Sequence, residues 1–515
     1  METLIQIWEA FIIAYFLAYN SINFFLLLVA FVRVRFFLRL KTFVSFDEIY
    51  KSGATPSVSL IVPAFNEGQT IVQSALSFAN LEYPNYELII VNDGSVDNTF
   101  KKLVSQFGFI RKDVGYSQAI PTARIRGFYE APKEDSSEPP HLASPARGEE
   151  KREWWGSGLK RIVLIDKENN GKADAINAGV NASTCTFICC LDADSILDRR
   201  ALLELMQPVV QNPDEIFACG GQIAIANGCK IRSGRVVKTD LPSSPLAMFQ
   251  AVEYIRSFTA GRTALAALNS LLILSGVFVV LKRDRVFQVG GFLTKNLDSR
   301  VALEYCCGQE TVCEDMEIIV RIYRYVLERD INENVLFLPY PIAWSQVPEK
   351  ISHFGRQRNR WYRGLAQVLS YHKVMLFNPK YRQVGMFAMP YQFLFEFLGP
   401  LIELTGYALV PVLYFSGMLH TEVFLLFLTV SIVYGMFLNL FAVLLGLWSE
   451  GKLESARGTS LFRYSGVMSV FRLMFYAIFS MLGYRQLQLF YQARGFIDYL
   501  LKKQSWEKFE REEFS

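Results

Sequence analysis

Long apolar stretches near both ends of the chain predict helices that cross a membrane. Residues Phe11 to Val32 carry no charge and match the length of about 20 residues that a helix needs to span the hydrocarbon core. Four basic residues follow between positions 33 and 41, whereas Glu2 and Glu9 precede the stretch. By the positive-inside rule, the C-terminal end of this segment lies in the cytoplasm. The basic cluster after the apolar run argues against a cleaved signal peptide.

A second apolar region begins near Val384. We expect Gly385 to Leu398 to form an interfacial or tilted helix, because a proline and a glutamate interrupt it, and Pro400 to Leu419 to span the membrane. Val423 to Leu447 is a cleaner span. The last apolar stretch, Leu473 to Gly483, is short for a full crossing, so crossing, lying flat and re-entering the membrane all stay open for it.

Two glutamates, Glu396 and Glu403, interrupt this second region. They are seven residues apart and share one face if the helix is continuous. A carboxylate inside a membrane is costly unless it faces a polar cavity or a partner. Two interpretations follow: an interfacial helix with both carboxylates among the headgroups, or a polar path for a hydroxylated product.

Short apolar strands alternate with helical segments between the first span and Val384. Strands are predicted at Ser57–Val62, Tyr86–Val91, Arg161–Ile165 and Thr186–Leu191, with a helix at Gly68–Asn80. This alternation predicts a parallel α/β sheet that binds ligands at the carboxyl ends of its strands. Residues 131–152 are rich in Pro, Ser, Glu and Lys, and we expect them to form a solvated insertion.

The composition agrees with a membrane protein and narrows its chemistry. Hydrophobic residues make up 51% and aromatic residues 14% of the 515 residues, which is too apolar for an ordinary soluble protein. The net charge of +4 gives no support for nucleic-acid binding, and no such partner is expected. None of the eight cysteines forms a paired zinc-type motif, so buried, reduced thiols are expected.

Acidic residues recur at the ends of the predicted strands. Glu67 follows the first strand, Asp93 follows the second, and Asp192 and Asp194 close another in the run Leu191-Asp192-Ala193-Asp194. Side chains two positions apart on a strand point the same way, so the last pair can converge on one ion. Carboxylates with room for substrate phosphates suit Mg²⁺ or Mn²⁺. One such turn is an ordinary acidic turn, but three at successive strand ends indicate a site.

Two predicted helix starts add charged groups. Lys172 and Asp174 lie at one of them, and a lysine at a helix N-terminus attracts phosphate. Glu314 and Asp315 open the other, a helix that continues to about Leu327, where first-turn acids would also serve as plain partners of the helix dipole.

A basic and aromatic segment precedes the second apolar region. It contains Gln357, Arg360 and Trp361 within the run Arg356 to Gly364. A basic amphipathic helix at the membrane surface is one interpretation. The other is functional, with arginine neutralising a departing diphosphate and tryptophan stacking on a sugar ring.

Taken in order, these motifs resemble those of the membrane enzymes of glycosyltransferase family 2, such as hyaluronan, chitin-oligosaccharide, cellulose and poly-N-acetylglucosamine synthases. The resemblance runs from about Val58 to Gly364 and implies a GT-A-type nucleotide-sugar-binding α/β domain inserted between transmembrane helices. It also implies the following roles. Glu67, Asp93, Lys172, Asp174, Asp192 and Arg360 would bind the donor, Asp194 and Asp192 the metal, Asp315 with Glu314 would be catalytic, and Gln357, Trp361, Ser275 and Gly276 would bind the acceptor.

The same resemblance implies an inverting, metal-dependent transfer from a UDP-sugar to a polysaccharide, with Mg²⁺ or Mn²⁺ as cofactor. The chain would lie in the inner (plasma) membrane with its catalytic domain in the cytoplasm, in contact with membrane lipids and with export partners in the envelope. A single transfer to a lipid-linked acceptor is the alternative, because ceramide glucosyltransferases carry a similar pattern. Cys313 departs from the family, which usually has Thr or Gly before Glu314.

These patterns divide the chain into five predicted parts. They are an N-terminal membrane helix with its basic flank (1–45), the α/β domain (56–348), an amphipathic interface helix (349–382), the C-terminal membrane and interfacial helices (383–484) and a basic cytoplasmic tail (485–515). For the proposed chemistry, Asp93, Asp192, Asp194 and Asp315 must gather in a single cleft that Arg360 and Trp361 close.

Overall fold

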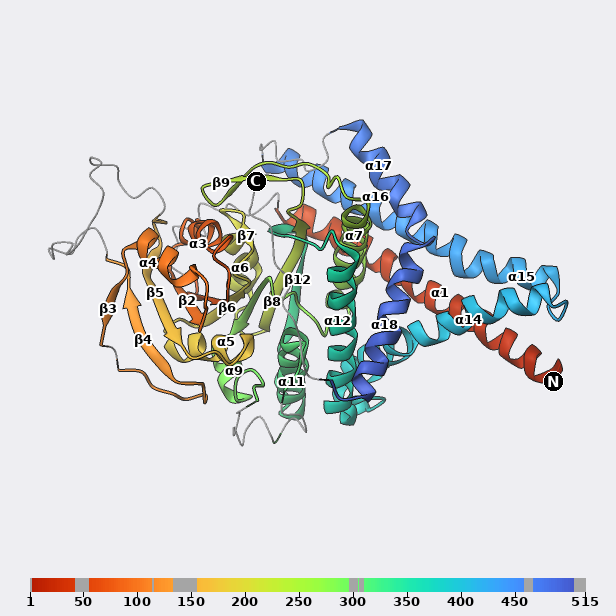
Figure 1. Ribbon diagram of the computed structural model, residues 1–515, viewed down its shortest axis with the longest axis horizontal. Coiled ribbons are helices and arrows are strands. Elements are labelled where there is room, and N and C mark those ends of the chain that lie inside the picture. The colour runs from red at the N-terminus through yellow and green to blue at the C-terminus, as the bar shows by residue number, and fades with distance from the viewer. Residues whose placement is uncertain are drawn as a thin grey trace.

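The computed structural model of the chain describes residues 2–41, 55–113, 115–132, 155–295, 304, 310–457 and 466–503. Most of the expected insertion at 131–152, and the tail beyond residue 503, lie outside these ranges. Figure 1 shows an α/β body on one side and a group of long helices on the other, with the N-terminus at the far end of those helices.

A ten-stranded sheet forms the centre of the α/β body, in the order β3-β4-β5-β2-β1-β6-β11-β8-β12-β7. Its strands are β1 (Val58–Ala64), β2 (Tyr86–Asp93), β3 (Ile110–Lys112), β4 (Ile125–Glu130), β5 (Leu159–Lys167), β6 (Phe187–Leu191), β7 (Ile196–Leu197), β8 (Ile216–Ile225), β11 (Phe278–Lys282) and β12 (Asn334–Ser345). A separate hairpin pairs β9 (Lys230–Arg232) with β10 (Arg235–Lys238).

The predicted strands and fold class are confirmed, but the sheet is mixed rather than parallel. The four neighbouring strands β5, β2, β1 and β6 run parallel to one another. β11 lies antiparallel between β6 and β8, and β4 lies antiparallel to β5. Strand direction depends on the connections, which a hydrophobic pattern does not encode. The parallel centre is covered on both faces, since every residue of β2 is buried.

Helices pack around this sheet and connect it to the membrane side. Those of the α/β body are α3 (Ile71–Ala79), α4 (Thr99–Phe107), α5 (Lys172–Ala182), α6 (Ala201–Gln211), α9 (Arg283–Gln288) and α11 (Glu314–Glu328). Between body and membrane helices lie α7 (Pro245–Ile255), the π-helical η1 (Arg256–Arg262), α8 (Thr263–Ala267), α12 (Ile351–Tyr371) and the 3₁₀ turns η2 (Lys373–Met375) and η3 (Pro379–Tyr381).

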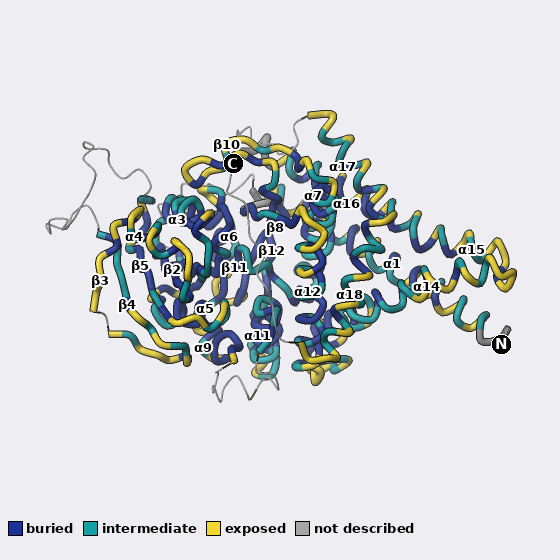
Figure 2. The backbone as a smooth tube through the Cα atoms, in the orientation of Figure 1, coloured by how far each residue is buried: buried dark blue, intermediate teal, exposed yellow. Residues whose placement is uncertain are grey.

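The remaining helices include the long apolar segments and α18, which carries charged and amide side chains. They are α1 (Glu2–Lys41), η4 (Val384–Ala388), α13 (Met389–Tyr391), η5 (Gln392–Phe397), α14 (Gly399–Phe415), α15 (Thr421–Leu428), η6 (Thr429–Val433), α16 (Tyr434–Arg457), α17 (Val467–Phe479) and α18 (Tyr484–Leu500). Figure 2 shows exposed and half-buried residues along the outer parts of these helices, in contrast to the buried strands of the sheet.

Within the described ranges, three helical segments are long and apolar enough to cross a membrane, and a bent pair makes a fourth if it counts as one span. The three are Ile5–Arg39, Val384–Phe415 and Thr421–Lys452. The expected division between Leu398 and Pro400 coincides with a break at Leu398, where η5 ends and α14 begins, although Val384–Phe415 as a whole is long and apolar enough to form one span. Pro400 sits in the first turn of α14, where its missing N–H costs little. α17 and α18 meet at 54°, as a broken span or a re-entrant loop would.

Candidate active site

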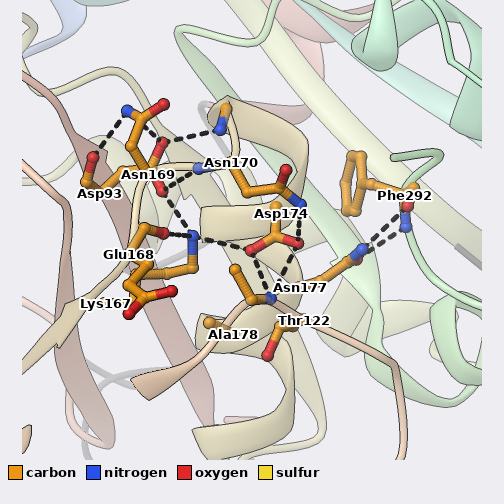
Figure 3. A network of polar contacts seen from close by, with 12 residues as sticks. Asp93, Thr122, Lys167, Glu168, Asn169, Asn170, Asp174, Asn177, Ala178 and Phe292 are labelled. Atoms are coloured by element: carbon orange, nitrogen blue, oxygen red, sulfur yellow. Dashed lines mark hydrogen bonds and ion pairs between the residues drawn. The ribbon is translucent and has the colours of Figure 1, made fainter. Parts of the chain in front are cut away.

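A buried lysine, Lys167, organises the carboxyl ends of the parallel strands. It is 0% exposed at the end of β5, and its Nζ atom lies 2.5 Å from Oδ1 of Asp93 and 2.7 Å from Oδ1 of Asp174. Figure 3 shows this lysine between the two aspartates. An ammonium group without charged partners would be very costly at this depth, so the two aspartates are what allow it to be there.

The same two aspartates hold the turn that leads into α5. Asp93 accepts hydrogen bonds from the backbone N–H groups of Asn170 (3.1 Å) and Gly171 (2.9 Å). Asp174 accepts one from the Asn170 side chain at 2.7 Å. Burial raises the pKa of Asp93, although Lys167 acts in the opposite direction. The network therefore fixes the N-terminus of α5 and, with it, the position of Lys172.

Lys172 joins two elements that the sequence suggested separately. Its Nζ atom lies 2.8 Å from Oδ1 of Asp192, just after β6, and 2.8 Å from Oε1 of Glu314, at the start of α11. Burial would lower the pKa of Lys172, but the two carboxylates outweigh it and the pKa rises. Lys172 is therefore a permanent positive charge at the junction of the two acidic motifs.

Asp315 faces the loop before β11. Its Oδ2 atom accepts a hydrogen bond from the N–H of Gly276 at 3.3 Å. A Cβ atom on Gly276 would lie 3.6 Å from this carboxylate and 3.2 Å from Nζ of Lys172, so the loop passes close to both groups. Burial raises the pKa of Asp315, and the charge of Glu314 raises it further. For Glu314, burial is outweighed by Lys172, and its pKa is lowered.

α12 carries the basic and aromatic motif and is fixed by a second ion-pair network. Arg358 donates to both carboxylate oxygens of Glu253 on α7, at 2.7 and 2.9 Å. Its guanidinium also lies 4.4 Å from the centre of the Trp361 ring. Glu253 in turn accepts a hydrogen bond from Gln488 of α18 at 2.8 Å. Trp361 is thus held by a residue that anchors α12 to two neighbouring helices.

Two cavities meet at this site. The sheet-edge cavity has a volume of about 890 Å³, and the membrane-side cavity has a volume of about 430 Å³. Both are lined by one shared set of residues: Lys172, Asp192, Val312, Glu314, Gln357 and Arg360. Glu67, Asp93 and Asp194 line the sheet-edge cavity. Ser275, Gly276, Asp315 and Trp361 line the membrane-side cavity.

The expected single cleft is therefore divided between two adjoining cavities. Asp192 and Arg360 line both, Asp93 and Asp194 line one, and Asp315 lines the other. Of the residues singled out from the sequence, Asp174 lines neither cavity, because it is 1% exposed beneath the α5 turn and bonded to Lys167.

The pair Asp192 and Asp194 suits a divalent metal. Among the described residues, no group of three or more His, Cys, Asp or Glu side chains is arranged to hold one. Two carboxylates at a cavity wall are nevertheless a common protein contribution to Mg²⁺, because substrate phosphates and water complete the shell. Both residues line the sheet-edge cavity, Asp194 at 2% exposure and Asp192 with its Oδ1 atom paired to Lys172.

The membrane-side cavity extends among the apolar helices. Polar residues from α1, η5, α14 and α18 line it, and these are Tyr19, Asn20, Asn23, Gln392, Glu396, Glu403, Arg485, Gln488 and Gln492. Glu403 is 2% exposed and pairs with Arg485, with Nη2–Oε1 at 2.5 Å and Nε–Oε2 at 3.0 Å. Of the two interpretations for the glutamates, the arrangement agrees with side chains that face a polar cavity.

Sequence reasoning missed Lys167, Glu253 and Arg262. Lys167 ends an apolar strand, and a lysine there is a signal for a buried ion pair. Glu253 and Arg262 lie in a helical region with no motif, and only the fold brings them to the site.

Comparison with known proteins places these residues in a family context. The family model described as "Glycosyl transferase family group 2" matches residues 187–448, more than half of the chain, and the one described as "Glycosyl transferase family 2" matches residues 59–131. The poly-beta-1,6-N-acetyl-D-glucosamine synthase of Staphylococcus epidermidis is 24% identical over 313 residues, 61% of this chain and 55% of the relative. The enzyme of the same name from Staphylococcus aureus (strain COL) is 24% identical over 340 residues, 65% of this chain and 60% of the relative. The chain thus spans little more than half the length of these curated relatives.

Solved structures show a looser likeness. The mannosyltransferase PcManGT from Pyrobaculum calidifontis, in complex with GDP-Man and Mn²⁺, has 14% identity and a TM-score of 0.45, over 96% of this chain and 100% of that one. Residues 1–349 of Staphylococcus aureus TarS, in complex with UDP-GlcNAc, have 13% identity and a TM-score of 0.36, over 84% of this chain and 92% of that one.

Proposed function

The chain belongs to glycosyl transferase family group 2, and from this membership we propose that it transfers a sugar from a UDP-sugar to a growing polysaccharide at the cytoplasmic face of the cell membrane. The observation that carries the proposal is the junction of the two cavities at Lys172, Asp192 and Glu314. A two-substrate reaction needs donor and acceptor to meet at one point while each keeps its own pocket.

The donor occupies the sheet-edge cavity. Glu67 and Asp93 contact its nucleotide part at the ends of β1 and β2, and Lys172 and Arg360 lie beside its diphosphate. Asp174 supports this pocket from beneath, through Lys167. Asp192 and Asp194 would hold Mg²⁺ or Mn²⁺, which would neutralise charge on the diphosphate.

The acceptor enters from the membrane-side cavity. Trp361 stacks on its terminal sugar, and Gln357, Ser275 and Gly276 line the same cavity. Asp315 takes the proton of the acceptor hydroxyl as this oxygen bonds to the anomeric carbon. The bond from that carbon to the diphosphate oxygen breaks, and its electron pair leaves on UDP. Because attack comes from the face opposite UDP, the anomeric configuration inverts.

Glu314 contributes a negative charge to the site but does not accept the proton of the acceptor hydroxyl. It pairs with Lys172 and keeps a negative charge beside Asp315. That charge raises the pKa of Asp315 and makes it a stronger base. Arg360 at the shared wall stabilises negative charge as the diphosphate departs.

Export of the polymer through the chain's own helices completes the proposal. The membrane-side cavity continues from Asp315 to Asn20, Glu396 and Glu403, so a hydroxylated chain meets polar groups as it leaves the site. Export partners in the envelope and contacts with membrane lipids belong to the same proposal.

A lipid acceptor is the second candidate. The same cavity is also lined by apolar residues of α1, Phe16, Leu26 and Leu27, which suit a hydrocarbon tail. Product size separates the two candidates. Purified protein with Mg²⁺ or Mn²⁺ is incubated with a panel of labelled UDP-sugars, starting with UDP-N-acetylglucosamine because of the names of the curated relatives. A polymer supports the first candidate, a single-sugar glycolipid supports the second, and no transfer from any donor contradicts both.

A further inference from the structure

The transfer proposed above assigns no role to Arg262, a charged residue of the membrane-side cavity. Arg262 ends η1, a π-helical stretch, and lines the cavity together with Asp315, Ser275 and Trp361. π-Helical turns are rare and occur frequently at functional sites, because they place a side chain that a regular helix would turn away. The question is what the guanidinium of Arg262 binds.

The backbone that carries Arg262 is held firmly. A Cβ atom on Gly446 of α16 would lie only 2.6 Å from the side chain of Ile255, so α16 packs directly onto the start of η1. Thr259 donates a hydrogen bond to Gln222 of β8 at 3.2 Å. η1 is therefore fixed to both the membrane helices and the sheet, and Arg262 is presented to the cavity by a rigid element.

The Arg262 side chain has an aromatic contact, but one of its nitrogen donors lacks a hydrogen-bond partner among the described residues. Its Cζ atom lies 4.3 Å from the centre of the Phe258 ring, which fixes the plane of the guanidinium. Its Nη1 atom is buried and has no hydrogen-bond partner among the described residues. Burial lowers the pKa of Arg262 to about 10, so the group stays charged at neutral pH. A buried charged donor without an acceptor is costly unless a ligand supplies one.

Three other cations of the cavity have carboxylate partners. Lys172 pairs with Asp192 and Glu314, Arg358 with Glu253, and Arg485 with Glu403. Each of these pairs ties two structural elements together, as a structural ion pair does. Arg262 instead lines this cavity with an Nη1 atom that has no hydrogen-bond partner among the described residues, and Asp315 lines the same cavity.

We propose that Arg262 binds the acceptor, and that Nη1 donates a hydrogen bond to a hydroxyl or ring oxygen of its terminal sugar. This inference rests on the proposed function, since Arg262 would bind the acceptor of the same transfer. With Trp361 stacked on the sugar face and Arg262 bonded to its edge, the attacking hydroxyl is turned toward Asp315.

The test compares Arg262→Met with the wild-type full-length protein in detergent. Methionine keeps an unbranched apolar stem over Phe258 and removes every donor. UDP-N-acetylglucosamine is the donor, and a β-1,6-linked N-acetylglucosamine tetrasaccharide is the primer. The matched control is Arg283→Met, because Arg283 also lies over a phenylalanine ring, Phe287, at 4.7 Å, and lines neither cavity.

We expect kcat/KM for the primer to fall about 10- to 100-fold in Arg262→Met, the range for a lost hydrogen bond to a charged group. The Kd for UDP and the melting temperature should stay near those of the Arg283→Met control. Arg262→Lys should recover part of the loss. An unchanged KM for the primer, with only the pH profile displaced, would make Arg262 a counter-ion of Asp315 and overturn the inference. If the wild-type protein transfers nothing from any UDP-sugar, the proposed function itself fails, which is a different result.

Discussion

Gly364 of α12 and Cys313, the residue before α11, approach so closely that a Cβ atom on Gly364 would lie 2.5 Å from Cβ of Cys313 and nearer still to its Sγ. This contact sets the distance between the helix that carries Trp361 and the helix that begins with Glu314 and Asp315. Here a glycine on α12 faces Cys313.

Gly364→Ala should therefore push α12 away from the catalytic helix. We expect the variant to lose about 1–3 kcal/mol of stability, the usual cost of overpacking, and to lose activity by more than its stability explains. Thermal unfolding and turnover measure the two effects. Cys313→Gly in the same chain removes both overlapping atoms and should restore much of each. Gly115→Ala is the control, since a Cβ there meets nothing within 4 Å; a harmless Gly364→Ala would refute the contact.

The pH dependence of turnover reports on Asp315. A general base works only when unprotonated, and burial together with the charge of Glu314 raises the pKa of Asp315. Turnover should therefore fall as the pH drops through this raised pKa, at a higher pH than an ordinary aspartate would give. Glu314→Gln removes the neighbouring charge, so the acid limb should move to lower pH. Asp284→Asn, an exposed first-turn acid of α9, should leave the limb in place. If turnover of Glu314→Gln falls at the same pH as turnover of the wild type, the charge of Glu314 does not raise the pKa of Asp315.

Metal dependence should be lost with Asp194. In the wild type we expect EDTA to remove most of the activity and Mg²⁺ or Mn²⁺ to restore it, because two carboxylates and the donor diphosphate complete the site. Asp194→Ala should show low activity that no metal concentration restores. The readout is UDP release over a metal titration, with Asp198→Ala as a control outside both cavities. Metal-stimulated activity in Asp194→Ala would assign the ion to other residues.

The ion pair of Glu403 and Arg485 should behave as a buried pair. Arg485→Met leaves Glu403 buried without its cation, and we expect a loss of about 3–5 kcal/mol. The double variant Glu403→Leu/Arg485→Met should be more stable than Arg485→Met alone, because no charge is left unpaired. Thermal unfolding of the wild type, Glu403→Leu, Arg485→Met and the double variant in detergent gives a double-mutant cycle. Additive losses would show that the two side chains do not interact.

Much of the α/β body could be predicted from the sequence. β2 contains the apolar run Leu88–Val91 and ends in Asn92 and Asp93, so both its burial and the position of its last acidic residue follow from the pattern. The acids at the start of α11 could be placed for the same reason, since they precede a clear helix. The expected family is confirmed by a match over more than half of the chain.

Other features depend on contacts between distant segments. The direction of β11 follows from the loop and helices before it, not from its own residues. The helix from Val384 to Phe415 breaks at Leu398, as the sequence indicated, but it accommodates Pro390 through π-helical turns that no local rule predicts. The roles of Lys167 and Arg262 depend on the fold, because distant segments bring two carboxylates to Lys167 and form the cavity beside Arg262.

The most direct test of the account is the variant Asp315→Asn, which keeps the shape of the side chain and removes its basicity. UDP binding by calorimetry and turnover with a labelled UDP-sugar are measured on the same preparation. We expect an unchanged Kd for UDP, because Asp315 lines only the membrane-side cavity, and turnover lower by roughly 10²–10⁴-fold, the contribution of a general base. Near-normal turnover in this variant would contradict the assignment of Asp315 and, with it, the proposed meeting point of donor and acceptor.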